Sequence, residues 1–275
     1  MSKIENPLGK NIEYPSKYNP NILFPICRKN HIEIPHISYE GFDLWNAYEL
    51  SWLNKNGKPE IAIGKFQFPC NSKNIIESKS LKIYLNSLNQ TRFIDHNDLQ
   101  KTIYKDLSIA TESNVLVDII MPSNFKDMHM EDLDGLCIDN INIETNTYLP
   151  SPELLKNDNQ KNIAYVNETI MSRLLRSNCP ITKQPDWACI QIKYRGFKIN
   201  HESLLKYIIS YRNHDAYHEN CIEKIFVDIM QNCNPEFLSV YAKYTRRGGI
   251  DINPWRTTNL QEYNPIINNT KTTRQ

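Results

Sequence analysis

A thiol and a carboxyl group lie seven positions apart in residues 177–187. Cys179 and Asp186 supply a nucleophile and a proton donor, and Pro180 and Pro185 stand between them. Because prolines exclude a regular helix or a central strand, we predict a shaped loop that turns both side chains toward one cavity. There the thiol can add to an electrophilic carbon while the carboxyl group gives a proton. The alternative is structural, since a free Cys is often a small buried apolar residue and Pro-Asp-Trp is typical of a turn.

A second cluster of titratable side chains follows about thirty residues later. His214 and His218 are spaced i and i+4, so they could bind zinc with Glu219 as a base if the segment is helical. The pattern is not HExxH, and no third ligand follows from spacing. Glu219 also fits a helix N-terminal carboxylate, as does Glu77, and a buried carboxylate can instead accept two N–H groups from a planar ring.

The C-terminal stretch combines guanidinium groups with flexible backbone. Arg246 and Arg247 are followed by Gly248 and Gly249, a combination that could hold a phosphate. The alternative is an Arg-rich turn at a subunit contact. No GxGxxG follows a predicted strand, so a dinucleotide would not be held in the Rossmann manner.

Composition excludes several classes of function. The 275 residues carry 32 Lys and Arg against 31 Asp and Glu, so no strong field attracts a nucleic acid or an anionic membrane. No run of about 18 apolar residues indicates a membrane span, and residues 1–7 lack the apolar core of a signal peptide. We therefore expect a cytoplasmic protein. Its seven Cys are an odd number without framework spacing, which favours free thiols.

The chain divides into an arm and two similar halves. Residues 1–40 lack periodicity and are expected to be an extended arm. A first module at 41–148 and a second at 163–275 are joined by a linker at 149–162 that contains two prolines. The elements expected in the first module are a hairpin of strands 48–53 and 61–68, helices from Glu77 to 88 and over 98–107, and strands 115–121 and 137–143.

The second module repeats this plan. Its expected elements are a helix at 164–176, a strand at 187–194, helices from Glu202 and over 221–230, and a strand at 238–242. The sequence thus predicts an α+β fold made by tandem duplication of a strand-strand-helix-helix unit. The two copies differ in their polar residues. The first copy carries the charged motif 77–80, whereas the second has the more apolar residues 202–205 at the corresponding place. Only the second copy contains Cys179 and Asp186. We expect the two copies to share one composite site at their junction.

Four motifs in this order resemble a known family. They are Glu77-Ser78-Lys79-Ser80-Leu81-Lys82, Ser177-Asn178-Cys179 with Gln184-Pro185-Asp186-Trp187, His218-Glu219, and Tyr244-Thr245-Arg246-Arg247-Gly248-Gly249. Together they closely resemble the NADPH-dependent 7-cyano-7-deazaguanine reductases in their long, two-module form. The resemblance implies tunnelling-fold modules whose antiparallel sheets form barrels on oligomerisation, here as a homodimer. It also implies reduction of a nitrile to an amine in queuosine biosynthesis, a tRNA modification pathway, with the free base as substrate and no direct contact with nucleic acid.

The resemblance also implies residue roles. Cys179 resembles the nucleophile that forms a covalent thioimide, and Asp186 resembles the proton donor. The positions that resemble substrate contacts are Ile76, Glu77, Ser78, His218 and Glu219. Those that resemble NADPH contacts are Ser78, Lys79, Arg247 and Gly248. No metal is implied. Tyr217 stands where the family usually has Phe, which adds a hydroxyl group near the substrate.

Two alternatives remain beside this interpretation. One is a zinc-dependent pterin-type enzyme of the same fold, with His214, His218 and a Cys as ligands, which stoichiometric zinc would support. The other is a non-catalytic two-module oligomer, which predicts an ordinary thiol at Cys179 and no nucleotide binding.

Overall fold

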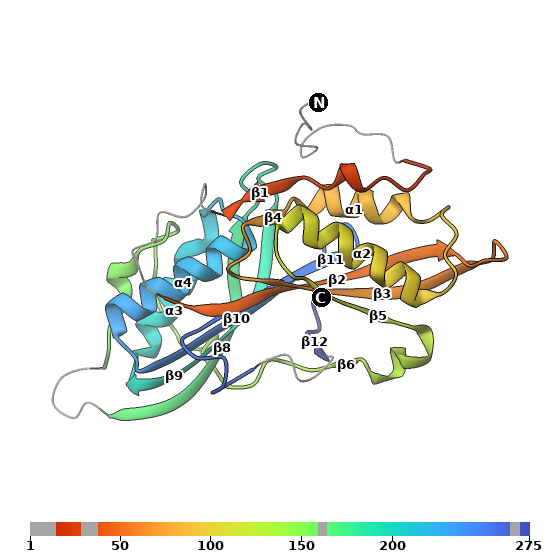
Figure 1. Cartoon of the computed structure of the whole chain (residues 1–275). Coiled ribbons are helices and arrows are strands. Elements are labelled where there is room, and N and C mark those ends of the chain that lie inside the picture. The colour runs from red at the N-terminus through yellow and green to blue at the C-terminus, as the bar shows by residue number, and fades with distance from the viewer. Residues whose placement is uncertain (1–14, 29–37, 159–163, 265–269) are drawn as a thin grey trace. The chain divides into compact units, whose positions relative to one another are not determined.

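The computed structural model describes residues 15–28, 38–158, 164–264 and 270–275 (Figure 1). Contacts divide the chain into two compact units. The first comprises the described residues of 1–32, 42–128 and 246–252, and the second those of 33–41, 129–245 and 253–275. These units are interleaved along the chain, whereas the predicted modules are consecutive. No helix in the described ranges is long and apolar enough to cross a membrane.

An antiparallel sheet forms the base of the first unit. It contains β2 (Glu40–Leu53, from Phe42 onward), β3 (Pro59–Pro69) and β5 (Leu116–Ile120), in the order β5-β3-β2. The β2–β3 hairpin is confirmed, and its loop closes where the amide of Asn54 donates to the carbonyl of Lys58 at 2.9 Å. The alternation of side chains along β2 shifts at an irregularity between residues 47 and 50.

Two helices pack against this sheet. Helix α1 (Ser78–Ser87) begins at Glu77, whose carboxylate accepts the first free amides, and α2 (His96–Thr111) begins at Asp95 in the same way. Both predicted helices are therefore confirmed. Their apolar faces join the strands in one buried core, which includes Trp45, Phe66, Leu81, Leu99, Ile103 and Ile119.

Residues 15–28 of the N-terminal arm lie on the first unit, whereas residues 38–40 belong to the second. A short 3₁₀ turn η1 (Pro20–Ile22) leads to β1 (Pro25–Cys27), which pairs with β4 (Asn74–Ile76). The Phe24 amide donates to Ser80 Oγ at 3.0 Å. Residues 1–14 and 29–37 of the predicted arm lie outside the described residues.

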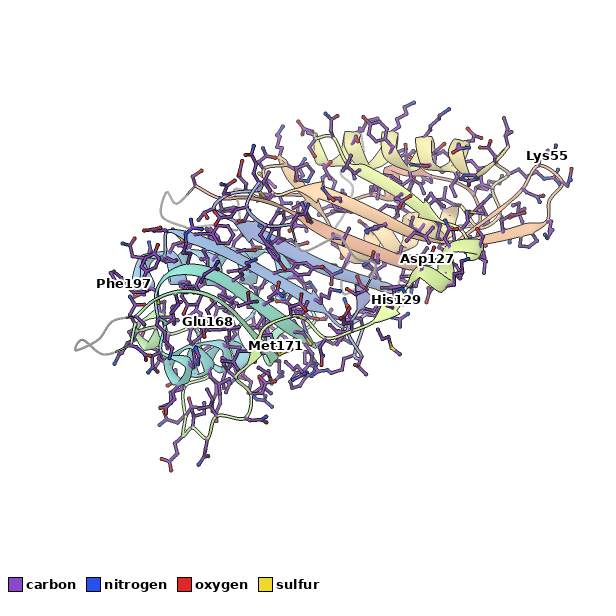
Figure 2. All side chains as sticks on the ribbon, turned by 90° about the horizontal axis from the view of Figure 1, so that it is seen from below. Lys55, Asp127, His129, Glu168, Met171 and Phe197 are labelled. Carbon is purple, nitrogen blue, oxygen red and sulfur yellow. The ribbon has the colours of Figure 1, made fainter. Side chains whose placement is uncertain are left out.

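The second unit is built on a longer sheet. Its strands are β7 (Leu136–Cys137), β8 (Tyr165–Asn178), β9 (Pro185–Phe197), β10 (Phe237–Tyr244) and β11 (Ile250–Thr257, from Asn253 onward), in the order β11-β10-β9-β8-β7. All these pairs are antiparallel except β7 with β8. Two short strands, β6 (His129–Met130) and β12 (Thr270–Lys271), pair with each other. Figure 2 labels Glu168 and Met171 on β8 and Phe197 at the end of β9.

Two predicted elements are wrong in this unit. The helix expected at 164–176 is strand β8, because the pairing with β9 shifts between Ser172 and Leu175 and so moves the apolar side chains out of simple alternation. The strand expected at 137–143 pairs only at Leu136 and Cys137. Beyond it Ile138 is buried against the core without a ladder of its own.

Helices α3 (His201–Ser210) and α4 (His218–Cys233) cover the core of the second unit, with the 3₁₀ turn η5 (Tyr211–Asn213) between them. The expected helices are confirmed, with α4 beginning three residues earlier than predicted. The core combines these helices with β8, β9 and β10 through residues such as Leu175, Ile190, Leu204, Ile225 and Val240. Two further 3₁₀ turns are η3 (Pro122–Asp127) and η4 (Pro152–Leu154).

The same local design recurs in both units. Helices α1 and α3 have 10 residues each, and α2 and α4 have 16. Tyr84 donates to Asp106 at 2.7 Å in the first unit, and Tyr207 donates to Asp228 at 2.6 Å in the second. Each pair ties the two helices of its unit together, which supports a duplicated strand-strand-helix-helix plan.

The repetition corrects one predicted correspondence. Glu202 was expected to occupy the place of Glu77, but Glu77 is the N-cap of α1 and the N-cap of α3 is Asn200. Ser80 and Ser203, three residues after the caps, both donate to the cap carbonyl, at 2.6 and 2.8 Å. Position 202 is therefore in the first turn of α3.

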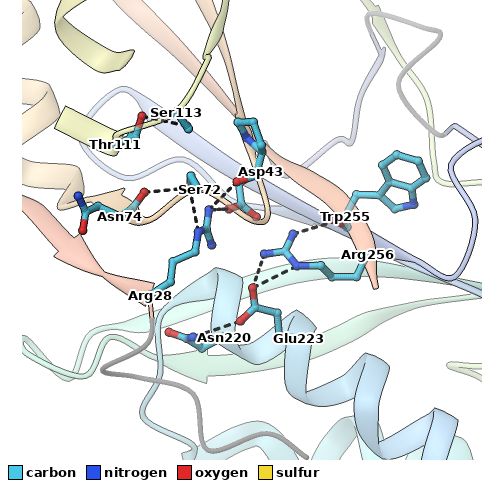
Figure 3. Close-up of polar contacts among 11 residues, drawn as sticks. Arg28, Asp43, Ser72, Asn74, Thr111, Ser113, Asn220, Glu223, Trp255 and Arg256 are labelled. Carbon is cyan, nitrogen blue, oxygen red and sulfur yellow. Dashed lines mark hydrogen bonds and ion pairs between the residues drawn. The ribbon is translucent and has the colours of Figure 1, made fainter. Parts of the chain in front are cut away.

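Each unit also buries an ion pair (Figure 3). In the first unit the guanidinium of Arg28 reaches Asp43 at 2.5 Å and Ser72 at 2.9 Å. In the second unit Arg256 Nη2 lies 2.6 Å from Glu223 Oε1, and both side chains are 0% exposed. The second pair joins β11 to α4.

Candidate active site

A tight hairpin between β8 and β9 presents Cys179. The Cys179 amide donates to the carbonyl of Gln184 at 2.9 Å, and the Lys183 amide donates to the Cys179 carbonyl at 3.0 Å. Lys183 completes the turn in the left-handed region, at φ 59°. The predicted shaped loop is thus confirmed but shorter than expected, because Pro185 already opens β9. A first strand position suits Pro, whose missing N–H costs no ladder bond there.

Strand register places the thiol and the carboxyl group on one side of this hairpin. Ser177 is directly opposite Asp186, and Cys179 follows Ser177 by two residues, so their side chains share a face. Cys179 is 7% exposed and Asp186 is 2% exposed. The Thr182 amide lies 3.5 Å from Cys179 Sγ as a donor.

The first turn of α4 brings His218 and Glu219 to the same place. His218 Nε2 is 3.7 Å from Asp186 Oδ2, and the His218 ring meets the ring of Tyr244 edge-on with centroids 4.1 Å apart. Glu219 is 2% exposed and lies in the first turn of α4. The second unit therefore gathers the predicted Asp186, His218 and Glu219 beside the Cys179 hairpin.

A buried polar cluster that sequence reasoning missed lies behind these residues. Burial raises the pKa of Cys221 to about 12, and the nearby charges of Asp186 and Glu219 act in the same direction. Burial also raises the pKa of Tyr244 well above its ordinary value. Both groups stay neutral at physiological pH, so they shape the site without competing with Cys179 as nucleophiles. In the sequence, Tyr244 only opened the Arg-Gly motif and Cys221 was one of seven Cys.

The zinc alternative loses its geometric basis in this segment. His214 ends η5 with φ −78° and ψ 129°, and α4 begins only at His218, so the two rings are not one helical turn apart. Burial, followed by the charge of Lys224, lowers the pKa of His214. In the ranges that the structure describes, no three His, Cys, Asp or Glu side chains are grouped to hold a metal ion.

The remaining predicted substrate positions lie together in the first unit, where β4 leads into α1. Ile76 ends β4 and is 3% exposed, while Ser78 and Lys79 open the helix. Glu77 accepts the Lys79 amide at Oε1 and the Ser80 amide at Oε2, both at 2.8 Å. Its pKa is raised by burial, against the opposing effect of these two bonds. A hydrogen bond with the Ser78 side chain also lowers this pKa, so three donors from the start of α1 contact the carboxylate.

The predicted phosphate cradle is a two-glycine turn in the first unit. The amide of Arg247 donates to the carbonyl of Ile250 at 2.9 Å, and Gly248 and Gly249 have φ of 59° and 77°. Two consecutive positive φ values are those of a type I′ turn, which favours glycine. A Cβ at Gly249 would lie 2.5 Å from the Glu49 carboxyl carbon. Lys79, Arg247 and Gly248 are therefore all in the first unit.

A pocket with a cavity volume of about 80 Å³ adjoins this turn within the first unit. Its lining includes Lys82, Asn86, Gly248 and Gly249. Lys82 Nζ is 3.5 Å from Glu49 Oε2 across the pocket. Sequence reasoning gave no role to Asn86 or Glu49, which stand out only once the helix and the turn are placed.

Two parts of the chain match models of protein families, and the first of these models describes nitrile reductases. Residues 14–119 match the family model described as "Nitrile reductase, 7-cyano-7-deazaguanine-reductase N-term", and residues 185–263 match the one described as "QueF-like protein". One solved structure, the archaeosine synthase QueF-Like in the apo form, covers 35% of this chain at 23% identity with a TM-score of 0.30, a likeness too low to bear on the fold.

Full-length relatives then give the particular family. The chain is 51% identical over 261 residues to the NADPH-dependent 7-cyano-7-deazaguanine reductase of Bordetella avium, covering 94% of each chain. It is 47% identical over 279 residues to that of Burkholderia cenocepacia, covering 100% of each, and 50% identical over 258 residues to that of Cupriavidus necator, covering 92% of each. The chain belongs to the family of NADPH-dependent 7-cyano-7-deazaguanine reductases.

Proposed function

We propose that this protein reduces the nitrile of 7-cyano-7-deazaguanine to the aminomethyl group, with two NADPH per turnover, as a step of queuosine biosynthesis. The single observation that carries the proposal is the Cys179 hairpin, with Asp186 on the same side and His218 3.7 Å from that carboxyl group. This arrangement suits an electrophilic carbon attached to a nitrogen that must be protonated, and a nitrile is such a group.

Cys179 begins the reaction by adding to the nitrile carbon. Its Sγ forms a C–S bond, and Asp186 gives a proton to the nitrile nitrogen, so that a neutral thioimide results. When bound, NADPH would supply a hydride for this carbon, and a second NADPH another after the C–S bond has broken; each hydride is matched by a proton that the nitrogen takes up, which Asp186 would relay. Between the two reductions the tetrahedral carbon expels the Cys179 thiolate and leaves an imine. Both C=N species hydrolyse in water, so burial of Cys179 and Asp186 protects them.

The deazaguanine ring presents N–H donors, and we assign them to Glu77 and Glu219. A carboxylate can accept two N–H groups of a planar ring with well-defined geometry. His218 would contact the substrate beside Asp186 and keep the acid oriented, and Ile76 and Ser78 stay the predicted substrate contacts of the first unit. Tyr217 is the N-cap residue of α4 without a side-chain capping bond. Its hydroxyl group is thus compatible with the role that Phe has in other family members.

The residues of the first unit fit the charge and shape of NADPH. Lys79 and Arg247 supply cations for its phosphates, Ser78 supplies a hydroxyl donor, and Gly248 allows close approach of the backbone. The crowding that a Cβ would cause at Gly248, 3.0 Å from Lys82 Cδ, supports a turn shaped for such an approach.

The finer architecture belongs to the same proposal. We assign the duplicated strand-strand-helix-helix units to the tunnelling fold, with antiparallel sheets that complete barrels in a homodimer. The reaction needs NADPH and a reduced thiol, which favours the cytoplasm. Light scattering would test the dimer, since a monomeric active enzyme is incompatible with it.

Intact-protein mass spectrometry tests the chemistry directly. The enzyme is mixed with 7-cyano-7-deazaguanine without NADPH, and an adduct of the whole substrate mass is expected, discharged when NADPH is added. Cys179→Ala should form no adduct, whereas Cys27→Ala, which removes a more accessible thiol, should form it normally. A folded wild-type protein without adduct, or an adduct retained in Cys179→Ala, would refute the covalent mechanism.

A further inference from the structure

The face of the β8–β9 hairpin opposite to Asp186 carries a second group of functional side chains. Asp186 and Ser177 are buried on the core side, so the next pair in the ladder, Arg176 and Trp187, faces the other way. Arg176 is tied to the hairpin by a bond from Nη2 to Asn178 Oδ1 at 3.1 Å. This second face therefore lies directly behind the proposed catalytic pair, within the second unit.

Three guanidinium groups converge on the indole of Trp187. The Cζ atoms of Arg176 and Arg212 are each 5.6 Å from the ring centroid, and that of Arg274 is 5.3 Å from it. They come from β8, from η5 and from the C-terminal segment, so segments far apart in the sequence supply one positive cluster. A cation held near an aromatic ring keeps its charge and most of its donors available.

These three arginines differ from the other arginines of the second unit. Arg173 pairs with Asp132 at 2.6 Å, Arg195 pairs with Glu262, and Arg256 pairs with Glu223. In contrast, none of the three in the cluster has a side-chain carboxylate of the described residues within 4.0 Å. The positive charges repel one another, and no ion pair with a described carboxylate side chain offsets this repulsion.

Arg176 has a hydrogen-bond donor that is not satisfied. Its Nε atom is buried without a hydrogen-bond partner, although burial of a charged donor is unfavourable unless it is paired. Within the part of the chain that the structure describes, Arg212 makes no hydrogen bond, and Arg274 donates only to the Arg173 carbonyl, at 3.3 Å. The cluster therefore keeps several guanidinium donors for a ligand. Planar forks of this kind match the oxygens of a phosphate.

We propose that Arg176, Arg212 and Arg274 form an oxyanion-binding site for a phosphate or pyrophosphate group, supported on Trp187. These residues belong to the second unit, whereas Lys79, Arg247 and Gly248 belong to the first, and the site does not depend on the chemistry of Cys179. Its ligand is a small phosphorylated molecule or a free phosphate, both of which offer the same oxygens to the three forks.

Calorimetric titration of the full chain with inorganic pyrophosphate at low ionic strength tests the site. Arg212→Gln and Arg274→Gln are exposed changes that break no ion pair, so folding should be kept, which circular dichroism verifies. Each should weaken binding at least tenfold. Arg195→Gln makes the same change of charge in the same unit and should stay within about twofold of the wild type. Arg247→Gln is titrated in the same way. Any pyrophosphate binding that this variant loses is assigned to the predicted NADPH contacts and is subtracted from the binding of the wild type.

Titrations with NADPH and NADH show whether the bound phosphate group belongs to the cofactor or is a free oxyanion. If the cluster variants weaken NADPH but not NADH, the site takes the 2′-phosphate of the cofactor. If they leave both unchanged but lose pyrophosphate, it takes a free oxyanion. The proposal is overturned if pyrophosphate and NADPH bind equally well to wild type and cluster variants, or if Arg195→Gln loses as much. It is also overturned if the cluster variants no longer self-associate but still bind pyrophosphate and NADPH as the wild type does.

Discussion

The buried pair of Arg256 and Glu223 allows a quantitative test of what holds α4 in place. Arg256 donates from Nε and Nη2 to Glu223 Oε1 at 3.2 and 2.6 Å, and from Nη1 to the Trp255 carbonyl at 2.8 Å. Asn220 donates to the other Glu223 oxygen at 3.3 Å. Since α4 carries His218 and Glu219 in its first turn, this contact with β11 bears on the site as well as on stability.

Removing one partner should cost far more than removing both. Glu223→Leu leaves the Arg256 charge buried without its carboxylate partner, so we expect a loss of about 3–5 kcal/mol in the free energy of unfolding. Arg256→Met leaves the buried carboxylate and should cost a similar amount. The double variant removes both charges and retains volume, so it should return to within about 2 kcal/mol of the wild type.

Urea unfolding followed by circular dichroism measures all four proteins at one pH. A matched control is Lys73 with Glu112, whose atoms are also 2.6 Å apart but whose side chains are 61% and 51% exposed. Lys73→Met should leave stability nearly unchanged, because solvent screens an exposed pair. If the double variant is as unstable as the sum of the single ones, or if the single variants are neutral, burial of an unpaired charge is not what decides stability here.

Three further predictions concern the proposed site. Because burial raises the pKa of Glu77 above 4.5, the native state keeps a proton that the unfolded chain has lost, so the free energy of unfolding should fall as the pH rises through this window. Glu77→Gln should flatten that part of a pH series of urea titrations. Asp186→Asn should preserve substrate binding but lower kcat about 10²- to 10⁴-fold in stopped-flow assays, and an unchanged kcat would exclude the proton-donor role. Gly249→Ala should raise the KM for NADPH through strain at φ 77° without slowing adduct formation in its absence.

The sequence was most informative where side-chain pattern and pairing agree. The β2–β3 hairpin and the start of α1 were predictable, because alternation ended at a turn rich in Asn and Gly and because the residues after Glu77 follow a helical pattern. The roles of Cys179, Asp186 and the His218-Glu219 pair came from motifs whose order resembles a family. They remain predictions for the experiments above.

Strand β8 shows why pattern alone can fail. Its apolar residues Val166, Ile170, Met171, Leu174 and Leu175 recur at intervals that fit one face of a helix. The shift between Ser172 and Leu175 produces the same intervals in a strand, because an irregular residue moves the alternation by one place. A long-range partner, β9, decides between the two, and no local window contains that information.

Equivalent turn and cap positions of the two units carry different side chains. Asn54 and Cys179 hold the same place in their hairpins, since each donates its amide across the loop, to Lys58 and to Gln184. The side chains at this place act differently, since Asn54 Oδ1 accepts the amides of Asn56 and Lys58 at 3.0 and 3.1 Å, whereas Cys179 closes its turn through its own amide and carbonyl. Likewise the side chains of Glu77 and Asn200 both cap a helix, yet only Glu77 brings a charge. Positions at which different side chains serve the same turn or cap are therefore those at which one copy could acquire a nucleophile and the other an acceptor.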